Sequence, residues 1–270
     1  AGSSDFVCRD VTPTDGGAGF RATCVCDAIG LEAVWTATIG DSLQLSLNVV
    51  NRSGKPVDFK LAFPHFAGLS VSPEPVDDFY FFPKSLLVSD APALIRQGYG
   101  DHQALYQVLD IFSPARGGGL SVRCLDSDGR YKVLALRKHL PGQVEQNEDA
   151  PLTPTADEFK WTNSLPAVAG IGLTYEYLRR TRQPGASFAP PDVAIAAHAG
   201  DWQTPMQQYA EWCRQVWKFR PYPSRLTPAL NMIAAGWGQS PIFRDGKYRT
   251  DFVGPRCDCI ELMSWWEWSA

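Results

Sequence analysis

Residues 43–51 read LQLSLNVVN, and this alternation decides the fold class of the chain. Every second residue is apolar and lies between polar neighbours, the pattern of a β-strand with one buried face; these residues are Leu43, Leu45, Leu47 and Val49. The next residues, Arg52-Ser53-Gly54, favour a turn. The stretch therefore predicts a half-buried strand followed by a reversal of the chain.

Similar period-two runs recur up to about Gly200. Residues 119–125, the turn sequence at 126–129 and residues 131–137 together predict a β-hairpin. A further alternating run contains Ile171, Leu173, Tyr175 and Tyr177. Prolines and glycines separate the runs, and few intervals could hold a long helix. We therefore expect a large antiparallel β-sandwich with little helix, in which residues 142–157 form an exposed loop.

The pattern changes near Gly200 to a helical one. Thr204 is a candidate N-cap, with Pro205 in the first turn and Gln207 three residues after the cap, as in a capping box. Apolar residues then recur at helical spacing, which predicts a helix over residues 204–218 that ends before Pro221. The residues expected on its buried face are Tyr209, Trp212, Val216 and Trp217.

Two largely apolar runs follow this helix, at residues 229–235 and 259–263. Continuous apolar strands are buried on both faces, as in a parallel sheet. They predict the first strands of a (β/α) barrel, and the chain divides into a β-sandwich domain (1–199), a connector helix (200–227) and the start of an incomplete barrel (228–270).

Composition and charge exclude several classes of function. The net charge is −4, and the 25 basic residues are scattered along the chain, so we expect no nucleic acid as a partner. No apolar run approaches the roughly 20 residues that cross a bilayer, so we expect no membrane span. The opening residues Ala1-Gly2-Ser3-Ser4 fit the end left by signal-peptide removal and fit a trimmed chain equally.

Seven cysteines leave disulfide pairing open, because an odd number leaves at least one thiol unpaired. Cys24 with Cys26, and Cys257 with Cys259, each place two sulfurs on one face of a strand. Zinc sites use wider spacing, so buried or bridged cysteines are favoured over a metal site, and no metal or cofactor is expected.

The residues that suggest chemistry gather after the two apolar runs. Indoles stack on the C–H faces of sugar rings, and carboxylates bind sugar hydroxyls. Barrel active sites lie at the carboxyl ends of the strands, where the chain places an acidic and tryptophan-rich cluster. The expected substrate-binding residues are Trp237, Glu261, Trp266 and Glu267, with Trp265 or Trp268 favoured as core. The alternative is that all these tryptophans are core.

Other motifs predict no catalytic site. The four histidines have no paired spacing, and no serine or cysteine stands in a Gly-x-Ser-x-Gly motif, so no hydrolase triad is predicted. The run Gly117-Gly118-Gly119 lacks the Lys-Ser/Thr of a phosphate loop and predicts a tight start to a strand. The fragment at residues 126–129 lacks the distant Glu of a calcium loop and predicts a turn.

With these pieces in order, the chain resembles glycoside hydrolases that carry an N-terminal β-supersandwich like that of galactose mutarotase, followed by a (β/α)8 catalytic barrel. The similar enzymes are α-galactosidase-like and endo-α-N-acetylgalactosaminidase-like, with an uncharacterised bacterial group beside them. Four places carry the likeness: Phe63-Pro64 with Gly68-Leu69; Gln107-Val108-Leu109-Asp110 with Gly117-Gly118-Gly119-Leu120; Gly200-Asp201-Trp202 with Tyr209, Trp212 and Trp217; and Glu261-Leu262-Met263-Ser264-Trp265-Trp266.

The resemblance implies a secreted, extracellular or periplasmic enzyme that acts on glycans, represented here by its N-terminal portion. A complete barrel takes about 250 residues, so the two catalytic carboxylates of such enzymes belong to later strands and the chain alone is expected to be inactive. Its partners are then a carbohydrate and a continuation or partner chain that covers residues 229–268. The alternative is a non-catalytic carbohydrate-binding or structural surface β-sandwich.

Overall fold

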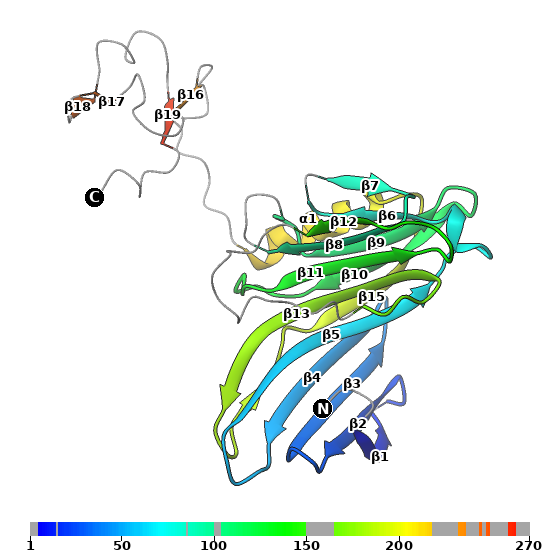
Figure 1. The fold of residues 1–270 in the computed structure, drawn as a ribbon, viewed down its shortest axis with the longest axis vertical. Coiled ribbons are helices and arrows are strands. Elements are labelled where there is room, and N and C mark those ends of the chain that lie inside the picture. Colours follow the sequence, from blue (N-terminus) through cyan, green and yellow to red (C-terminus); the bar gives the residue numbers. More distant parts are fainter. Residues whose placement is uncertain are drawn as a thin grey trace. The chain divides into compact units, whose positions relative to one another are not determined.

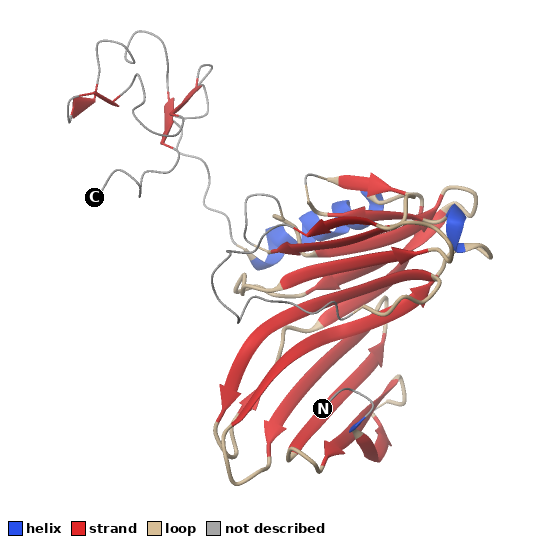
Figure 2. Cartoon of the chain, viewed as in Figure 1, coloured by secondary structure: helices blue, strands red, loops and turns tan. Residues whose placement is uncertain are grey.

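The computed structural model describes residues 5–14, 16–84, 86–99, 104–149 and 165–217, together with four short strands after them. The chain divides into two compact units, residues 1–217 and residues 218–270. Strands dominate the first unit, which is a β-sandwich as predicted (Figures 1 and 2). The three-part division at residues 199 and 227 stays a prediction.

The larger sheet of the sandwich has ten strands, all paired antiparallel. Its order is β1-β2-β3-β4-β15-β10-β9-β6-β7, with β14 beside β4. The strands are β1 (Val7–Pro13), β2 (Gly19–Cys26), β3 (Leu31–Ile39), β4 (Leu43–Asn51), β6 (Phe79–Phe82), β7 (Leu87–Ser89), β9 (Val108–Ser113), β10 (Gly118–Cys124), β14 (Ser187–Phe188) and β15 (Val193–Ala199). The alternating run at residues 43–51 is β4, as predicted.

The smaller sheet has the order β12-β8-β11-β13-β5. Its strands are β5 (Val57–Leu69), β8 (Ala93–Gly98), β11 (Val133–His139), β12 (Gln146–Asp149) and β13 (Gly170–Arg182), and a short 3-10 helix, Pro75–Asp77, lies between β5 and β6. Strand β12 pairs in parallel with β8. The prediction of a loop over residues 142–157 was therefore wrong at β12, where backbone pairing with an edge strand outweighs a polar side-chain pattern.

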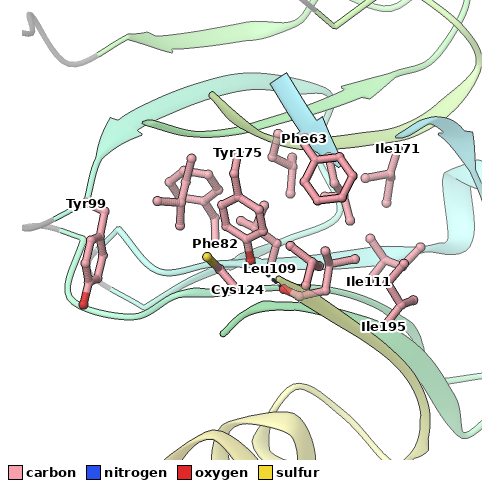
Figure 3. Close-up of a cluster of buried hydrophobic side chains, with 14 of the residues drawn as sticks. Phe63, Phe82, Tyr99, Leu109, Ile111, Cys124, Ile171, Tyr175 and Ile195 are labelled. Carbon is pink, nitrogen blue, oxygen red and sulfur yellow. Dashed lines mark hydrogen bonds between the residues drawn. The ribbon is translucent and has the colours of Figure 1, made fainter. Parts of the chain in front are cut away.

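The core lies between the two sheets (Figure 3). Leu109, Ile111 and Ile195 enter it from the larger sheet, while Ile171 and Tyr175 enter it from the smaller one. Each of these side chains is at most 8% exposed. The first eight residues of β13 are all buried, so this strand is covered on both faces.

The predicted hairpin of residues 119–137 was wrong. Strand β10 pairs with β9 and β15 in the larger sheet, whereas β11 pairs with β8 and β13 in the smaller one. The turn between them, Asp126 to Gly129, therefore carries the chain from one sheet to the other. Alternation reports a buried face but not the partner of a strand, so the two readings look the same in the sequence.

The helix α1 (Gln203–Val216) confirms the predicted helix with a different start. Thr204 lies inside the helix. The residue that precedes the helix is Trp202, and its side chain makes no capping hydrogen bond. Instead, the Asp201 carboxylate accepts a hydrogen bond from the Gln203 amide at 2.9 Å, so the predicted capping box was wrong. Within the described part of the chain, no helix is long and apolar enough to cross a membrane.

The second unit contains four described strands: β16 (Met232–Ala235), β17 (Phe243–Arg244), β18 (Lys247–Tyr248) and β19 (Cys259–Leu262). Strands β16 and β19 pair in parallel, with Met232 opposite Cys259 and Ala235 opposite Leu262. Strands β17 and β18 form an antiparallel pair between them in the sequence. The two apolar runs thus form neighbouring parallel strands, as predicted, and the described residues include no closed barrel.

Candidate functional site

The helix α1 packs on the outer face of the larger sheet, against β9 and β15. Tyr209 and Cys213 are buried there beside Val108. Side chains at the margin of this cluster are Tyr106, Met206, Trp212 and Trp217. Of the predicted buried face, Tyr209 is buried, Trp212 and Trp217 are half-buried, and Val216 is 36% exposed, so the prediction for Val216 was wrong.

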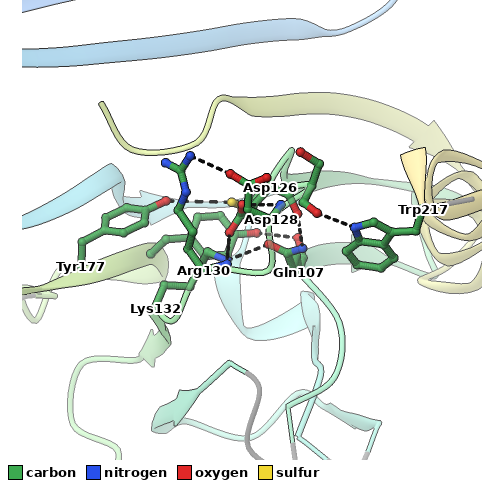
Figure 4. A network of polar contacts seen from close by, with 10 residues as sticks. Gln107, Asp126, Asp128, Arg130, Lys132, Tyr177 and Trp217 are labelled. Atoms are coloured by element: carbon green, nitrogen blue, oxygen red, sulfur yellow. Dashed lines mark hydrogen bonds and ion pairs between the residues drawn. The ribbon is translucent and has the colours of Figure 1, made fainter. Parts of the chain in front are cut away.

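The C-terminal end of α1 is fixed to the turn that joins the two sheets. The indole N–H of Trp217 donates to the Ser127 carbonyl at 2.7 Å (Figure 4). The same turn is organised by Asp126, whose carboxylate accepts from the backbone N–H of Asp128 at 3.1 Å and of Arg130 at 2.7 Å. One carboxylate therefore sets the turn on which the helix end rests.

Asp126 also holds a buried lysine. The Lys132 ammonium donates to an Asp126 carboxylate oxygen and to the Gln107 side-chain oxygen, both at 2.8 Å, and lies 4.3 Å from the centre of the Tyr99 ring. The Lys132 side chain is 0% exposed and the Asp126 side chain 2% exposed. A lone charge at such depth is costly, so the pair stabilises the junction by mutual neutralisation.

Gln107 completes this polar network. Its side-chain N–H donates to the Asp126 carbonyl at 3.0 Å, and its backbone carbonyl accepts from the Tyr175 hydroxyl at 3.0 Å. Tyr175 lies on β13 of the smaller sheet, whereas Gln107 immediately precedes β9 of the larger one. The network therefore ties together both sheets and the turn below α1. We call Gln107, Asp126, Lys132, Tyr175 and Trp217 the sheet-to-helix brace.

The N-terminal end of α1 is fixed by a second group of contacts. Trp202 stacks on Phe81 of β6, with ring centres 5.1 Å apart and planes 2° from parallel. Close by in sequence, His198 of β15 contacts the Asp110 carboxylate of β9 through Nε2 at 2.8 Å. The His198 side chain is 1% exposed and that of Asp110 is 0% exposed. Both anchors lie on the approach to the helix.

The geometry of His198 favours its charged form. Its second ring nitrogen, Nδ1, lies 3.2 Å from the Ala199 carbonyl oxygen. A carbonyl and a carboxylate are both acceptors, so each ring nitrogen must carry a proton to satisfy both contacts. Burial alone lowers the pKa of His198, but the Asp110 hydrogen bond and charge, with the Ala199 carbonyl and Asp201, raise it above its ordinary value of 6.5.

Burial also raises the pKa of Asp110, and this outweighs the lowering by its hydrogen bond to His198. Among the described residues, the second oxygen of the Asp110 carboxylate has no hydrogen-bond partner. The folded protein therefore holds protons on this pair more tightly than the unfolded chain does.

Two glycines of the predicted tight strand start make room for these contacts. A Cβ on Gly119 would lie 2.4 Å from the Ile111 carbonyl oxygen of β9 and 2.6 Å from the His198 Nε2 atom, so glycine makes room for both the neighbouring strand and the imidazole. Gly117 has a φ of +66° and accepts a hydrogen bond from the Gly200 amide at 2.8 Å. The prediction of a strand start, rather than a phosphate loop, is confirmed.

The contacts between α1, the larger sheet and the turn at residues 126–129, which together form the junction, hold the helix in place and supply no reactive group. The charged ends of Asp126 and Lys132 are taken up by one another and by neighbouring donors and acceptors. His198 has both ring nitrogens engaged by Asp110 and a carbonyl, which leaves neither nitrogen to activate a nucleophile. In the described residues, no group of three His, Cys, Asp or Glu side chains could hold a metal ion.

The predicted substrate-binding residues are separate from this junction in the sequence. Glu261 lies in β19, opposite Ala234 of β16. Trp237, Trp266 and Glu267 lie outside the described residues, as do Trp265 and Trp268. Their role in binding stays a prediction.

Sequence reasoning missed the ion pairs of the junction. His198 and Asp110 are 88 positions apart, and no local spacing links them. One signal was available, because the family resemblance singled out Gln107, Asp110 and Gly200-Asp201-Trp202. The structure places Gln107 at the turn that contacts the C-terminal end of α1, and Asp110, Asp201 and Trp202 near its N-terminal end. The likeness thus marks the attachment of the helix.

No family model matches the sequence, and a search of the curated proteins finds no match. Solved structures similar to the chain include an α-galactosidase of glycoside hydrolase family 36, AgaA from Geobacillus stearothermophilus, in complex with stachyose (TM-score 0.44, 9% identity, 85% of this chain and 30% of that chain). An α-galactosidase from Lactobacillus brevis is also similar (TM-score 0.46, 12% identity, 84% and 29%). A protein from Synechocystis is a third (TM-score 0.39, 14% identity, 70% and 65%).

The chain thus spans about 30% of the length of the first of these structures. The α-galactosidases that the sequence resembles are also among the solved structures to which the chain is similar. The matches cover the N-terminal part of the chain, which contains the antiparallel sandwich.

Proposed function

We propose that the chain is the N-terminal portion of a secreted glycoside hydrolase that acts on glycans. The observation that carries this proposal is the change of sheet type along the chain. Up to β15 almost every strand pair is antiparallel, and after α1 the strands β16 and β19 pair in parallel. An antiparallel sandwich followed by parallel strands is the order of a sandwich domain leading into a (β/α) barrel.

The connection between β16 and β19 supports this assignment. Parallel neighbours need a crossover of a dozen residues or more, and residues 236–258 provide one that includes the short β17–β18 pair. In a barrel, consecutive parallel strands are neighbours, as β16 and β19 are. The sheet-to-helix brace and the stacked Trp202 hold α1, the last described element before these strands, on the sandwich.

We also propose that residues 1–270 alone hydrolyse no glycoside. A (β/α) barrel closes with eight strands, and the described residues of the second unit contribute one parallel pair. Catalysis by a glycosidase takes two carboxyl groups that flank the scissile bond, about 5 to 5.5 Å apart in retaining enzymes. We propose that both lie on strands downstream of this chain.

We propose that the carbohydrate contacts Trp237, Glu261, Trp266 and Glu267. Trp237 follows β16 and Trp266 follows β19 in the sequence, and the carboxyl ends of parallel strands meet at one edge of a sheet. Indoles offer stacking surfaces for sugar rings, and carboxylates accept from sugar hydroxyls. Such partial contacts support weak binding without turnover.

The test is hydrolysis of a panel of aryl α- and β-glycosides by residues 1–270 and by the protein purified from its source. The proposal expects turnover by the source protein and none above the buffer blank by residues 1–270. Turnover by residues 1–270 that Glu261→Gln or Glu267→Gln abolishes would place the catalytic groups in this chain and contradict the proposal. Sugar binding without turnover by the source protein would make it a non-catalytic binding protein.

A further inference from the structure

Two thiols face one another across the first two strands. Cys8 of β1 is directly opposite Cys24 of β2 in the antiparallel register. Neither Cys8 nor Cys24 is bonded to another cysteine. Cys8 is exposed and Cys24 is half-buried, so this pair is open to solvent. We propose that Cys8 and Cys24 form a disulfide that ties β1 to the sandwich.

The spacing of antiparallel strands suits this bond. Directly opposite residues have Cα atoms about 4.5 or 5.5 Å apart, depending on the kind of pair, and both values fall within the range of roughly 4.4 to 6.8 Å found for disulfides. Their Cβ atoms are typically about 4.5 to 5.5 Å apart, against about 3.8 Å in a disulfide. Bond formation therefore needs the two strands to approach by about 1 Å.

Strand β1 is free to make this approach. Among the described strands it lies at the edge of its sheet with β2 as its one partner, and every one of its residues is exposed. The register shifts between Cys8 and Asp10, so a β-bulge lies next to the cysteine. A bulge bends the strand locally and absorbs a small displacement without moving the rest of the ladder.

The register also selects the partner. Cys26 lies on the same face of β2 as Cys24, two residues on, but is 1% exposed and pairs with Leu31 of β3. The register toward β1 also excludes Cys26: Val25 is opposite Val7, the first residue of β1, so Cys26 lies beyond the end of that strand. The described cysteines outside this region, Cys124 and Cys213, are buried. Cys24 is therefore the partner within reach of Cys8.

The chemistry is a thiol–disulfide exchange with a small-molecule disulfide such as oxidised glutathione. The exposed Cys8 thiolate attacks one sulfur of oxidised glutathione, expels a glutathione thiolate and forms a mixed disulfide. The Cys24 thiolate then attacks the Cys8 sulfur and expels the second glutathione. The two protein thiols lose two protons and two electrons, and one oxidised glutathione becomes two thiols.

The order of attack follows from the surroundings of the two thiols. Burial raises the pKa of the Cys24 thiol, and its hydrogen bond to Cys8 adds to the rise. A thiol with a raised pKa is a poor first nucleophile, whereas exposure favours Cys8 in that role. The disulfide would link the edge strand β1 covalently to β2, so β1 could no longer separate from the larger sheet by itself.

The experiment equilibrates the full 270-residue chain with oxidised glutathione, blocks free thiols by alkylation and maps the unreduced tryptic digest by mass spectrometry. Trypsin separates the peptide that ends at Arg9 from residues 22–52, so a bond between Cys8 and Cys24 links these two peptides. Fragmentation across Val25 distinguishes Cys24 from Cys26. The linked pair is expected in the unsubstituted chain and in Cys26→Ala, and is expected to be lost in Cys8→Ser and Cys24→Ser.

A second measurement gives the effect on the fold. Hydrogen exchange of the β1 amides is expected to slow on the order of a hundredfold on oxidation, because the bond closes a short loop and suppresses separation of the edge strand. Alkylation of both Cys8 and Cys24 after equilibration in oxidised glutathione would overturn the proposal. So would a linkage of Cys8 to Cys26 or to either cysteine of the second unit.

Discussion

Replacement of Asp126 by asparagine tests whether the buried charge pair stabilises the junction. The substitution keeps the size of the side chain and removes the charge that faces Lys132, whose ammonium is 2.8 Å from the carboxylate and has no access to solvent. Breaking a buried pair from one side typically costs 3 to 5 kcal/mol. We expect a loss of about 3 kcal/mol, the lower end, because the Gln107 oxygen and the Tyr99 ring still face the ammonium.

For a unit of 217 residues this loss corresponds to a fall in melting temperature of about 6 to 12 °C. Urea unfolding followed by circular dichroism measures the free energy without adding salt, which would screen charges. The matched control is Asp128→Asn in the same turn, where the ion pair with Arg130 is 62% and 52% exposed and is worth less than about 1 kcal/mol. Equal losses for the two variants would refute the argument that burial makes the Asp126 pair important.

Three further predictions concern α1 and its neighbours. Because the His198 pKa is raised in the folded state, the contribution of His198 to stability is present below about pH 6.5 and is lost as pH rises through the raised pKa. The free energy of unfolding should therefore fall over this pH range, and it should fall less in His198→Gln. Urea titrations at several pH values check this, and an unchanged pH slope would contradict it. Gly119→Ala should cost roughly 1 to 3 kcal/mol because its Cβ would meet the Ile111 carbonyl oxygen and the imidazole. Gly40→Ala, with open space at its Cβ, should be nearly neutral, and equal unfolding midpoints for the two variants would argue against this crowding. Trp217→Phe removes the N–H donor to the Ser127 carbonyl and should cost about 1 kcal/mol and speed amide exchange in the last turn of α1, and unaltered exchange there would count against this anchor.

Period-two patterns predicted individual strands well but not their partners. The alternating residues at 43–51 and 171–177 lie in strands β4 and β13, as their patterns predicted. Alternation is typical of a strand with one buried face, although the first eight residues of β13 are buried on both faces. The same logic failed for β10 and β11, since two adjacent alternating runs with a turn between them fit a hairpin and a crossing between sheets equally. The choice was made by long-range pairing to β9, β15, β8 and β13, which no local pattern encodes.

The polar junction shows the same limit at the level of side chains. A turn sequence at residues 126–129 was recognisable, but nothing near it indicated that Asp126 would be buried with Lys132. Burial of that lysine depends on Tyr99 and Gln107, which come from other segments of the chain. The prediction of the start of α1 was wrong for a related reason. Thr204 fits an N-cap by residue type, but the hydrogen bond to the Gln203 amide at the start of the helix is accepted by Asp201.

The central claim, that this sandwich and its docked helix lead into a catalytic barrel, is tested most directly by the intact mass of the protein purified from its source. Residues 1–270 have a mass of 29.8 kDa. A barrel of about 250 residues that begins near residue 228 would add on the order of 200 residues, or roughly 20 kDa, to that mass. We predict a native mass well above 29.8 kDa, with sequence that continues past Ala270 in a repeating strand and helix pattern. A native mass of 29.8 kDa, measured on protein that ends at Ala270, would contradict the account.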